Sequence, residues 1–213
     1  YKIIPLPTIH FGTDLIWLEK YLKRGYEYIA LGGLGQEAQQ NDYIKWADKA
    51  YHLICDPVTH LPKVKVHGFA MTSHRLMSRY PWYSVDSTSW LVFGSYGQII
   101  VPPFKNGKWC YDIPFDVYRV SLRKSESLKK IAITNLFTEK IRDQILRYIA
   151  EKGFVLGESK TENGEETIII PGLSNNDVHR CDLNALYFLD FAKSRPKWPW
   201  PFLEETPIKM NLL

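Results

Sequence analysis

The sequence predicts an α/β fold built around a parallel β-sheet. Between residues 3 and 86, short apolar stretches typical of buried strands alternate with segments whose apolar residues recur at helical spacing. Glycines, prolines and helix-capping residues separate these stretches from one another. Such an alternation places consecutive strands parallel to one another and joins them by right-handed crossovers. We therefore expect the order βαβαβαβ in this part of the chain.

Each expected element has its own start and stop signals. Residues 3–11 are apolar and close on a glycine, which is typical of a strand. Residues 13–24 place leucines on one helical face, begin at a capping Thr13 or Asp14, and stop at Gly25. The other expected elements here are a strand at 26–31, a helix from 41 or 42 to about 55, a strand at 63–69, a short helix at 72–79 and a strand at 83–86.

The rest of the chain has a different composition. Residues 94–120 are rich in glycine, proline and aromatic residues, which predicts loops with short strands. We expect residues 1–95 to form the first part of the fold and residues 96–213 to form an α+β appendage packed on it. The expected elements of the appendage are a helix at 138–152, a hairpin at 154–170 around Asn163-Gly164, a helix at 177–193 and an extended Pro/Trp-rich tail at 195–202.

The composition is that of an ordinary globular chain. Apolar residues make up 45% of the 213 residues, and the net charge of +4 is too small to establish nucleic-acid binding by itself. No apolar run approaches the roughly 18 residues that span a bilayer, and residues 1–9 lack a signal-peptide pattern. Cys55, Cys110 and Cys181 lie too far apart for a compact zinc site, and their odd number favours reduced thiols. We therefore expect a cytoplasmic protein with no membrane contact, no metal and no cofactor.

Asp86 is the strongest candidate for chemistry. It ends an apolar strand and is followed by Ser87, Thr88 and Ser89. A carboxylate at the carboxyl end of a parallel strand can attack a sugar carbon and hold a covalent glycosyl intermediate. The same position also suits an Asx turn or a helix cap, and the residues alone leave both interpretations open.

Three other features each allow both a functional and a purely structural interpretation. Gly32-Gly33 lets the backbone approach a flat ligand, or forms a tight turn; it matches neither a dinucleotide fingerprint nor a P-loop. His67 and His10 can stack on a base or move a proton, or can be structural histidines. A basic segment can contact phosphates, or can be a solvated face. Its members are Arg119, Arg123, Lys124, Lys129 and Lys130.

Four strand-end phrases together resemble one family. They are IHFG at 9–12, YIALGGL at 28–34, VHGFA at 66–70 and VDS at 85–87, in the order of the last four barrel strands of tRNA-guanine transglycosylases. The longer phrases GYEYIALGGL and VHGFAMTSHRLMSRYPWYSVDSTSW look closest to phage-type members, which exchange guanine in DNA for a 7-deazaguanine. The resemblance covers about residues 3–95 and implies the C-terminal half of a (β/α)8 TIM-type barrel.

The resemblance also implies roles for single residues. Asp86 matches the aspartate that acts as the nucleophile at the end of the last barrel strand. The other matching positions contact the base. The backbone of the Gly32-Gly33-Leu34 turn matches the segment that binds it, His67 matches the residue that packs on it, and His10 matches the residue that helps to hold it.

The departures from the family pattern are informative. The tRNA enzymes carry a Cys-x-Cys-x-x-Cys zinc cluster and arginines shortly after the nucleophile, whereas this sequence lacks the cluster and continues with Trp90-Leu91-Val92-Phe93. Both differences favour the phage type. The family's other key aspartates lie on earlier strands that this chain does not contain. We therefore expect a missing segment or a second chain to complete the barrel, and no catalysis without it.

The sequence thus leads to the hypothesis of a transglycosylase that exchanges guanine in DNA for a 7-deazaguanine through an aspartyl-glycosyl intermediate. Its expected partners are DNA, single-stranded or with a flipped base, and the 7-deazaguanine base, with the basic segment following the phosphates. One alternative is a noncatalytic nucleic-acid-binding subunit or half-barrel partner. Two others are a tRNA-guanine transglycosylase and a glycosylase that removes the base without replacing it.

Overall fold

The chain folds into two compact units. A computed structural model describes residues 5–33, 40–121, 139–162 and 165–204. The first unit comprises the residues up to Ser87 together with those from Pro196 onward, and the second comprises Thr88–Arg195. From the sequence alone, the division is expected after residue 95. The observed division lies earlier because the segment that follows Asp86 forms a helix that packs within the second unit.

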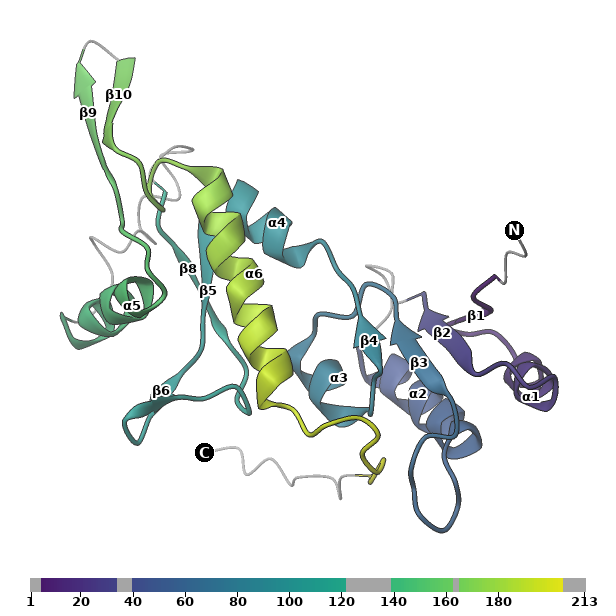
Figure 1. The fold of residues 1–213 in the computed structure, drawn as a ribbon. Helices are drawn as coiled ribbons and strands as arrows, with labels where there is room; N and C mark the ends of the chain where they lie inside the picture. Colours follow the sequence, from purple (N-terminus) through teal and green to yellow (C-terminus); the bar gives the residue numbers. More distant parts are fainter. Residues whose placement is uncertain (1–4, 34–39, 122–138, 163–164, 205–213) are drawn as a thin grey trace. The chain divides into compact units, whose positions relative to one another are not determined.

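The first unit contains a four-stranded parallel sheet with the strand order β1-β2-β3-β4 (Figure 1). Helices connect successive strands, so the predicted βαβαβαβ order is confirmed for the described residues. The elements are β1 (Thr8–His10), α1 (Ile16–Lys23), β2 (Tyr28–Gly32), α2 (Gln40–Ile54), β3 (Lys65–Gly68), α3 (His74–Arg79) and β4 (Ser84–Val85).

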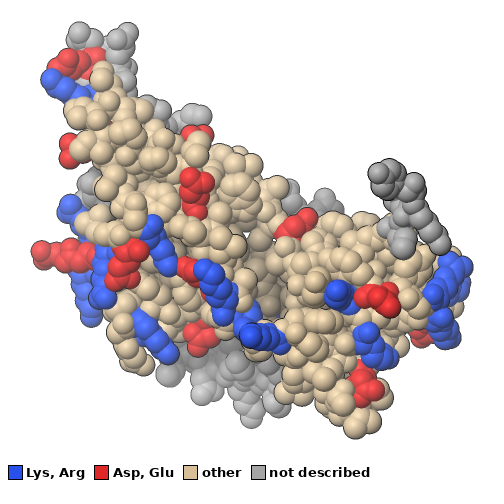
Figure 2. All heavy atoms as spheres, viewed as in Figure 1, with Lys and Arg blue, Asp and Glu red and all other residues tan. Residues whose placement is uncertain are grey.

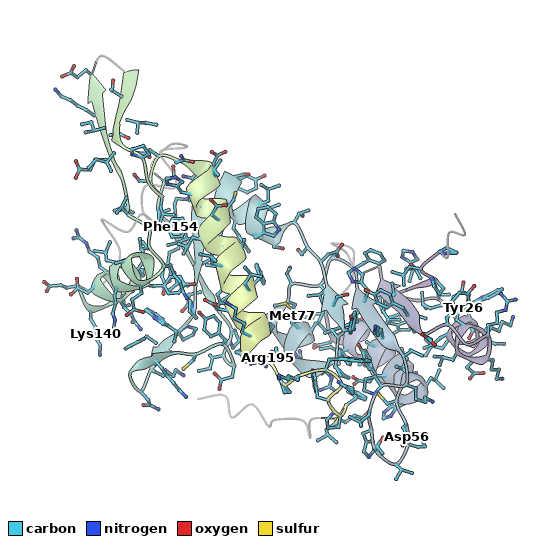
Figure 3. All side chains as sticks on the ribbon, in the orientation of Figure 1. Tyr26, Asp56, Met77, Lys140, Phe154 and Arg195 are labelled. Atoms are coloured by element: carbon cyan, nitrogen blue, oxygen red, sulfur yellow. The ribbon has the colours of Figure 1, made fainter. Side chains whose placement is uncertain are left out.

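The core of this unit lies where α2 meets the sheet and α3. Helix α2 buries Tyr43, Ala47 and Tyr51, which recur at helical spacing along one face. The Tyr51 ring stacks on Tyr80, with 4.7 Å between the ring centroids. Figure 3 shows the side chains of the described residues on the ribbon, with Tyr26, Asp56 and Met77 labelled in the first unit.

The Pro/Trp-rich tail packs on the first unit. The tail, predicted to be extended over residues 195–202, contains no helix or strand in its described part at 196–204 and has bends at Trp198 and Pro199. Phe202 is 3% exposed and contacts the rings of Tyr51 and Tyr80. The Trp198 indole N–H donates to the carbonyl of Pro81 at 3.2 Å. These contacts attach the chain beyond α6 to the first unit.

In its described residues, the second unit combines three helices with three short antiparallel pairs. Strand β5 pairs with β8, β6 with β7, and β9 with β10. The predicted helices near 138–152 and 177–193 and the hairpin at 154–170 are confirmed; the Asn163-Gly164 turn lies outside the described residues. The elements are α4 (Ser89–Ser95), β5 (Gln98–Val101), β6 (Phe104–Lys105), β7 (Lys108–Trp109), β8 (Asp116–Arg119), α5 (Glu139–Glu151), β9 (Glu158–Glu162), β10 (Glu165–Ile170) and α6 (Asp177–Ser194).

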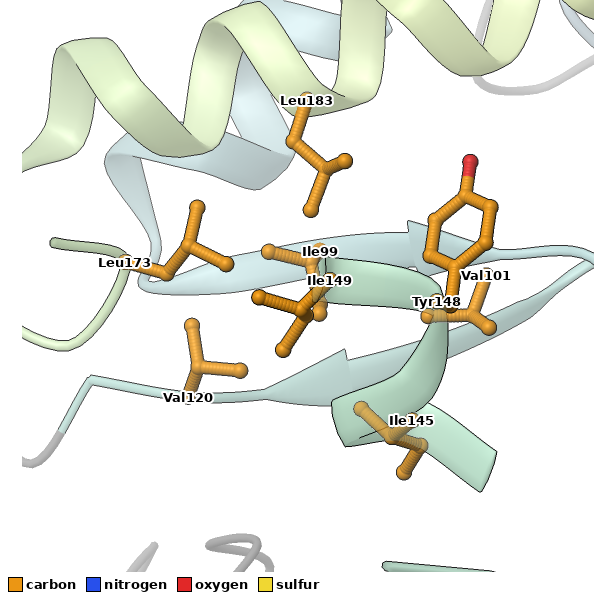
Figure 4. Close-up of a cluster of buried hydrophobic side chains, with 8 residues drawn as sticks. All are labelled: Ile99, Val101, Val120, Ile145, Tyr148, Ile149, Leu173 and Leu183. Carbon is orange, nitrogen blue, oxygen red and sulfur yellow. The ribbon is translucent and has the colours of Figure 1, made fainter. Parts of the chain in front are cut away.

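A cluster of aliphatic side chains and one tyrosine holds the second unit together (Figure 4). Its members come from β5, α5 and α6, together with Leu173 and with Val120, the residue that follows β8. Within the same unit, the buried Asn184 side chain of α6 accepts from the N–H of Ile100 and donates to the carbonyls of Trp90 and Gln98. No helix in the described part of the chain is long and apolar enough to cross a membrane.

Candidate active site

The carboxyl ends of all four parallel strands lie along one edge of the sheet. In the strand register, His10 pairs with Gly32, Leu31 with Gly68, and Gly68 with Val85. The residues that sequence analysis selected therefore come to one edge, as expected for parallel strands. They are His10, Gly32, Gly33, His67 and Asp86, whereas Leu34 lies outside the described residues.

The Asp86 carboxylate is held in place and is accessible. Its Oδ1 accepts a hydrogen bond from the backbone N–H of Ala70 at 2.8 Å, and its side chain is 55% exposed. The Asp86 main chain is fixed on both sides, because its N–H donates to Gly68 at 3.2 Å and its carbonyl accepts from Met71 at 2.8 Å. The carboxylate thus bonds to a loop 16 residues earlier, while the N-cap of the following helix α4 is Thr88.

The donor to Asp86 has an unusual backbone conformation. Ala70 has a φ of +55°, in the left-handed region that non-glycine residues rarely adopt. This conformation directs the Ala70 N–H at Asp86. Residues held in such conformations cluster at binding and catalytic sites, so the geometry of Ala70 supports a site at this position.

His67 stands beside Asp86 on the neighbouring strand. Its Nε2 lies 3.8 Å from Asp86 Oδ2, and its side chain is 14% exposed. Its Nδ1 makes a 2.7 Å hydrogen bond with Ser84 Oγ, which in turn lies 2.7 Å from the Tyr28 hydroxyl. The His67 ring also contacts Phe69 edge-on, with 4.6 Å between the centroids. His67 is therefore both oriented and close to the carboxylate.

The Gly32-Gly33 pair forms a tight strand end. Gly33 has a φ of +85°, and the N–H of Phe11 donates to the Gly32 carbonyl at 2.8 Å. A Cβ on Gly32 would lie 3.3 Å from the Phe69 Cβ. Both glycines are thus explained by close packing of the strand ends, and the exposed Gly33 also leaves backbone atoms accessible at the edge.

His10 is exposed at the end of β1 and lies far from the carboxylate. Strands β1 and β4 are the outer strands, so His10 and Asp86 are about 14 Å apart at a spacing of about 4.8 Å per strand. Any shared ligand would have to span the sheet edge to reach both residues. The structure thus groups Asp86 with His67 and separates it from His10.

Four residues of the site were missed by sequence reasoning. Tyr28 and Ser84 are polar side chains within short, otherwise apolar strands, which is the signal that could have identified them. Phe69 and Ala70 belong to the VHGFA phrase, but neither residue type indicates a role by itself. The cross-strand contacts identify all four: Tyr28, Phe69, Ala70 and Ser84.

The predicted phosphate-binding segment is mostly outside the described residues. Arg119 is the half-buried last residue of β8 in the second unit. The other four members, Arg123, Lys124, Lys129 and Lys130, lie in the segment that the structure does not describe. On the face visible in Figure 2, basic and acidic side chains are interspersed.

The described residues contain no group of three or more His, Cys, Asp or Glu side chains that could hold a metal ion. Cys55, Cys110 and Cys181 are free and buried. Burial raises the pKa of the Cys55 thiol to about 11, which keeps it protonated at neutral pH. Among the residues selected from the sequence, Asp86 therefore carries the candidate chemistry.

Comparison with known proteins gives no relative. No family model matches the chain, and neither a curated protein nor a solved structure matches it.

Proposed function

We propose that this chain is the nucleophile-bearing half of a (β/α)8 transglycosylase that exchanges guanine in DNA for a 7-deazaguanine. The proposal is supported by the parallel sheet, by the position of Asp86 at the carboxyl end of its last strand, and by the resemblance of the strand-end phrases to guanine transglycosylases. In barrels of this type the chemistry takes place at that end of the strands.

The observation that carries the proposal is the environment of the Asp86 carboxylate. One oxygen is fixed by the Ala70 N–H at 2.8 Å, and the other is 3.8 Å from His67 Nε2. With 55% of the side chain exposed, a substrate can reach it. A carboxylate that is oriented in advance and accessible is the requirement for nucleophilic attack at a sugar carbon.

The exchange proceeds through two displacements at the anomeric carbon. Asp86 forms a bond to C1′ while the C1′–N9 bond breaks, and guanine leaves with that electron pair and takes up a proton. The 7-deazaguanine then loses its N9 proton, attacks C1′ and releases the aspartate. The target nucleotide must be unstacked, either in a single strand or by flipping from a duplex. A dry pocket around Asp86 requires the remaining strands of the barrel, which a further segment or a second polypeptide supplies.

Covalent trapping tests the proposal. The chain, together with the segment or polypeptide that completes the barrel, is mixed with guanine-containing single-stranded DNA, quenched in denaturant and weighed intact. We expect an adduct whose mass is that of the protein plus the DNA strand less guanine. Asp86→Asn should abolish it. Asp42→Asn is the matched control, because the Asp42 side chain is also 55% exposed in the same unit.

The other outcomes separate the alternatives. Salt-sensitive DNA binding without an adduct, in the complete barrel, would replace the proposal with a noncatalytic binding subunit. Abasic sites formed without added 7-deazaguanine would indicate a glycosylase. An adduct with tRNA and none with DNA would indicate a tRNA enzyme.

A further inference from the structure

Three polar side chains from three neighbouring strands form a continuous line that ends at Asp86. The Tyr28 hydroxyl lies 2.7 Å from Ser84 Oγ, and Ser84 Oγ lies 2.7 Å from His67 Nδ1. His67 Nε2 then lies 3.8 Å from Asp86 Oδ2. The three side chains come from β2, β4 and β3, so their contacts depend on how these three strands pair.

The register explains why these side chains meet. His67 pairs with Ala30 on one side and with Ser84 on the other, so His67 and Ser84 project from the same face of the sheet. Tyr28 precedes Ala30 by two residues and therefore projects from that face as well. The long tyrosine side chain spans the remaining distance to Ser84.

The direction of the protons follows from their number. Ser84 has a single hydroxyl proton, so when it donates to one of its two neighbours it can only accept from the other. If neutral His67 carried its proton on Nδ1, its Nε2 lone pair would face the Asp86 carboxylate. With the proton on Nε2, an N–H faces the carboxylate instead, which is electrostatically favourable. Tyr28 then donates to Ser84, and Ser84 donates to His67 Nδ1.

We propose that Tyr28 and Ser84 form a directed hydrogen-bond chain that holds His67 in its Nε2–H tautomer, and that His67 is thereby a positioning residue for Asp86. The role in catalysis rests on the proposed function. Asp86 Oδ1 is held by the Ala70 N–H, and the Nε2–H directs the position of Oδ2 from the other side. The hydrogen bond from Ala70 fixes Oδ1, and the positive end of the Nε2–H dipole, 3.8 Å away and beyond hydrogen-bond distance, favours one orientation of Oδ2. Oδ2, the less tightly held oxygen, is the one that attacks C1′.

The tautomer is measured directly and without any substrate. In protein labelled with ¹⁵N-histidine, long-range ¹H–¹⁵N correlation spectra distinguish a protonated ring nitrogen from an unprotonated one, and His67→Gln assigns the signals. At a pH where the spectrum shows neutral imidazole, we expect His67 to carry its proton on Nε2. A proton on Nδ1 in the unaltered protein would overturn the proposal, and this result needs no variant that might fail to fold.

Variants of Ser84 test the chain itself. Ser84→Ala removes the donor to Nδ1, so we expect the His67 tautomer populations to shift, whereas Ser84→Thr keeps the hydroxyl and should preserve the signals. The exposed His10, three strands from Asp86, serves as the internal reference and should not change. An unchanged His67 spectrum in a folded Ser84→Ala protein would contradict the chain.

The effect on catalysis is measured with the adduct assay in the complete barrel. Ser84→Ala should slow adduct formation at least about tenfold at unchanged DNA affinity, because a misplacement of about 1 Å can cost about 100-fold. Ser84→Thr should restore the rate. An unchanged rate in Ser84→Ala would overturn the positioning role while the transglycosylase function stands. If the unaltered protein forms no adduct, the function fails and this catalytic role fails with it, whereas the tautomer measurement still decides the hydrogen-bond chain.

Discussion

No side chain fits between Gly33 and Phe11. A Cβ on Gly33 would lie 2.8 Å from the Phe11 backbone nitrogen and 3.3 Å from the His10 Cβ, and the Gly33 φ of +85° is itself unfavourable for other residues. The N–H of Phe11 donates to the neighbouring Gly32 carbonyl. The ends of β1 and β2 are therefore held together by a backbone contact that only glycine allows.

Gly33→Ala should destabilise the first unit more than Gly12→Ala. Both glycines have a positive φ, but nothing lies within 4 Å of a Cβ on Gly12. Gly12→Ala should therefore cost only the left-handed conformation, about 1 kcal/mol. Gly33→Ala must also displace the end of β1, so we expect a loss of roughly 2–4 kcal/mol. Denaturant unfolding of the two variants measures the difference, and equal losses would show that the contact with Phe11 is not tight.

Much of the first unit could be predicted because its local signals agree with its tertiary structure. Glycines and prolines located the strands and helices to within a few residues, except that the first strand, expected over residues 3–11, is only Thr8–His10. Helix α4 was missed because the run Trp90–Phe93 is continuously apolar, which shows no helical period. Its existence depends on packing against α6, where Gly94 lies directly against Cys181. Such a contact between residues distant in the sequence cannot be read from either segment alone.

Part of the candidate site could likewise be predicted from the sequence, and part could not. The parallel-strand rule alone places Asp86 and His67 at one edge of the sheet, so their proximity could be predicted. The contacts of His67 with Ser84, and of Ser84 with Tyr28, depend on which residues pair across three strands. The Ala70 N–H depends on a backbone conformation that alanine does not favour. Register and strained backbone were therefore the information that the sequence analysis lacked.

Phe202→Ala should detach the tail from the first unit. The Phe202 ring is 3% exposed and packs against Tyr51 and Tyr80, and its N–H donates to the His60 carbonyl. Truncating a buried phenylalanine costs about 3–5 kcal/mol. We expect a loss of that size in the free energy of unfolding, measured by denaturant titration.

Leu203→Ala is the control for the tail. Leu203 adjoins Phe202 but is 61% exposed, so its truncation should change stability by less than about 0.5 kcal/mol. Limited proteolysis adds a local measurement, because Phe202→Ala should make the chain around residues 196–204 cleavable while Leu203→Ala should not. A Phe202→Ala protein as stable and as resistant as the control would show that the tail contributes little to the first unit.

The ion pair between Lys152 and Asp190 should make the second unit sensitive to acid. Burial alone would raise the pKa of Asp190, but the ammonium groups of Lys152 and Lys193 outweigh it and lower the pKa below its ordinary value. A carboxylate whose pKa is lower in the folded state stabilises the fold above its unfolded pKa, which is about 3.9. That stabilisation is lost as the pH falls through the lower, folded value.

Asp190→Asn should therefore destabilise the second unit near neutral pH and have progressively less effect below about pH 4. We expect a loss of roughly 1 kcal/mol at pH 7, because Lys152 and the Tyr111 hydroxyl lose a charged acceptor in a half-buried position. Asp182→Asn, at an exposed position on the same helix, is the matched control and should change stability at pH 7 by less than about 0.5 kcal/mol. Unfolding curves between pH 3 and pH 7 make the comparison.

A difference between Asp190→Asn and the unaltered protein that stays constant across this range would mean that the ionised carboxylate does not stabilise the unit. Asp190 would then act only through its shape and its neutral hydrogen bonds.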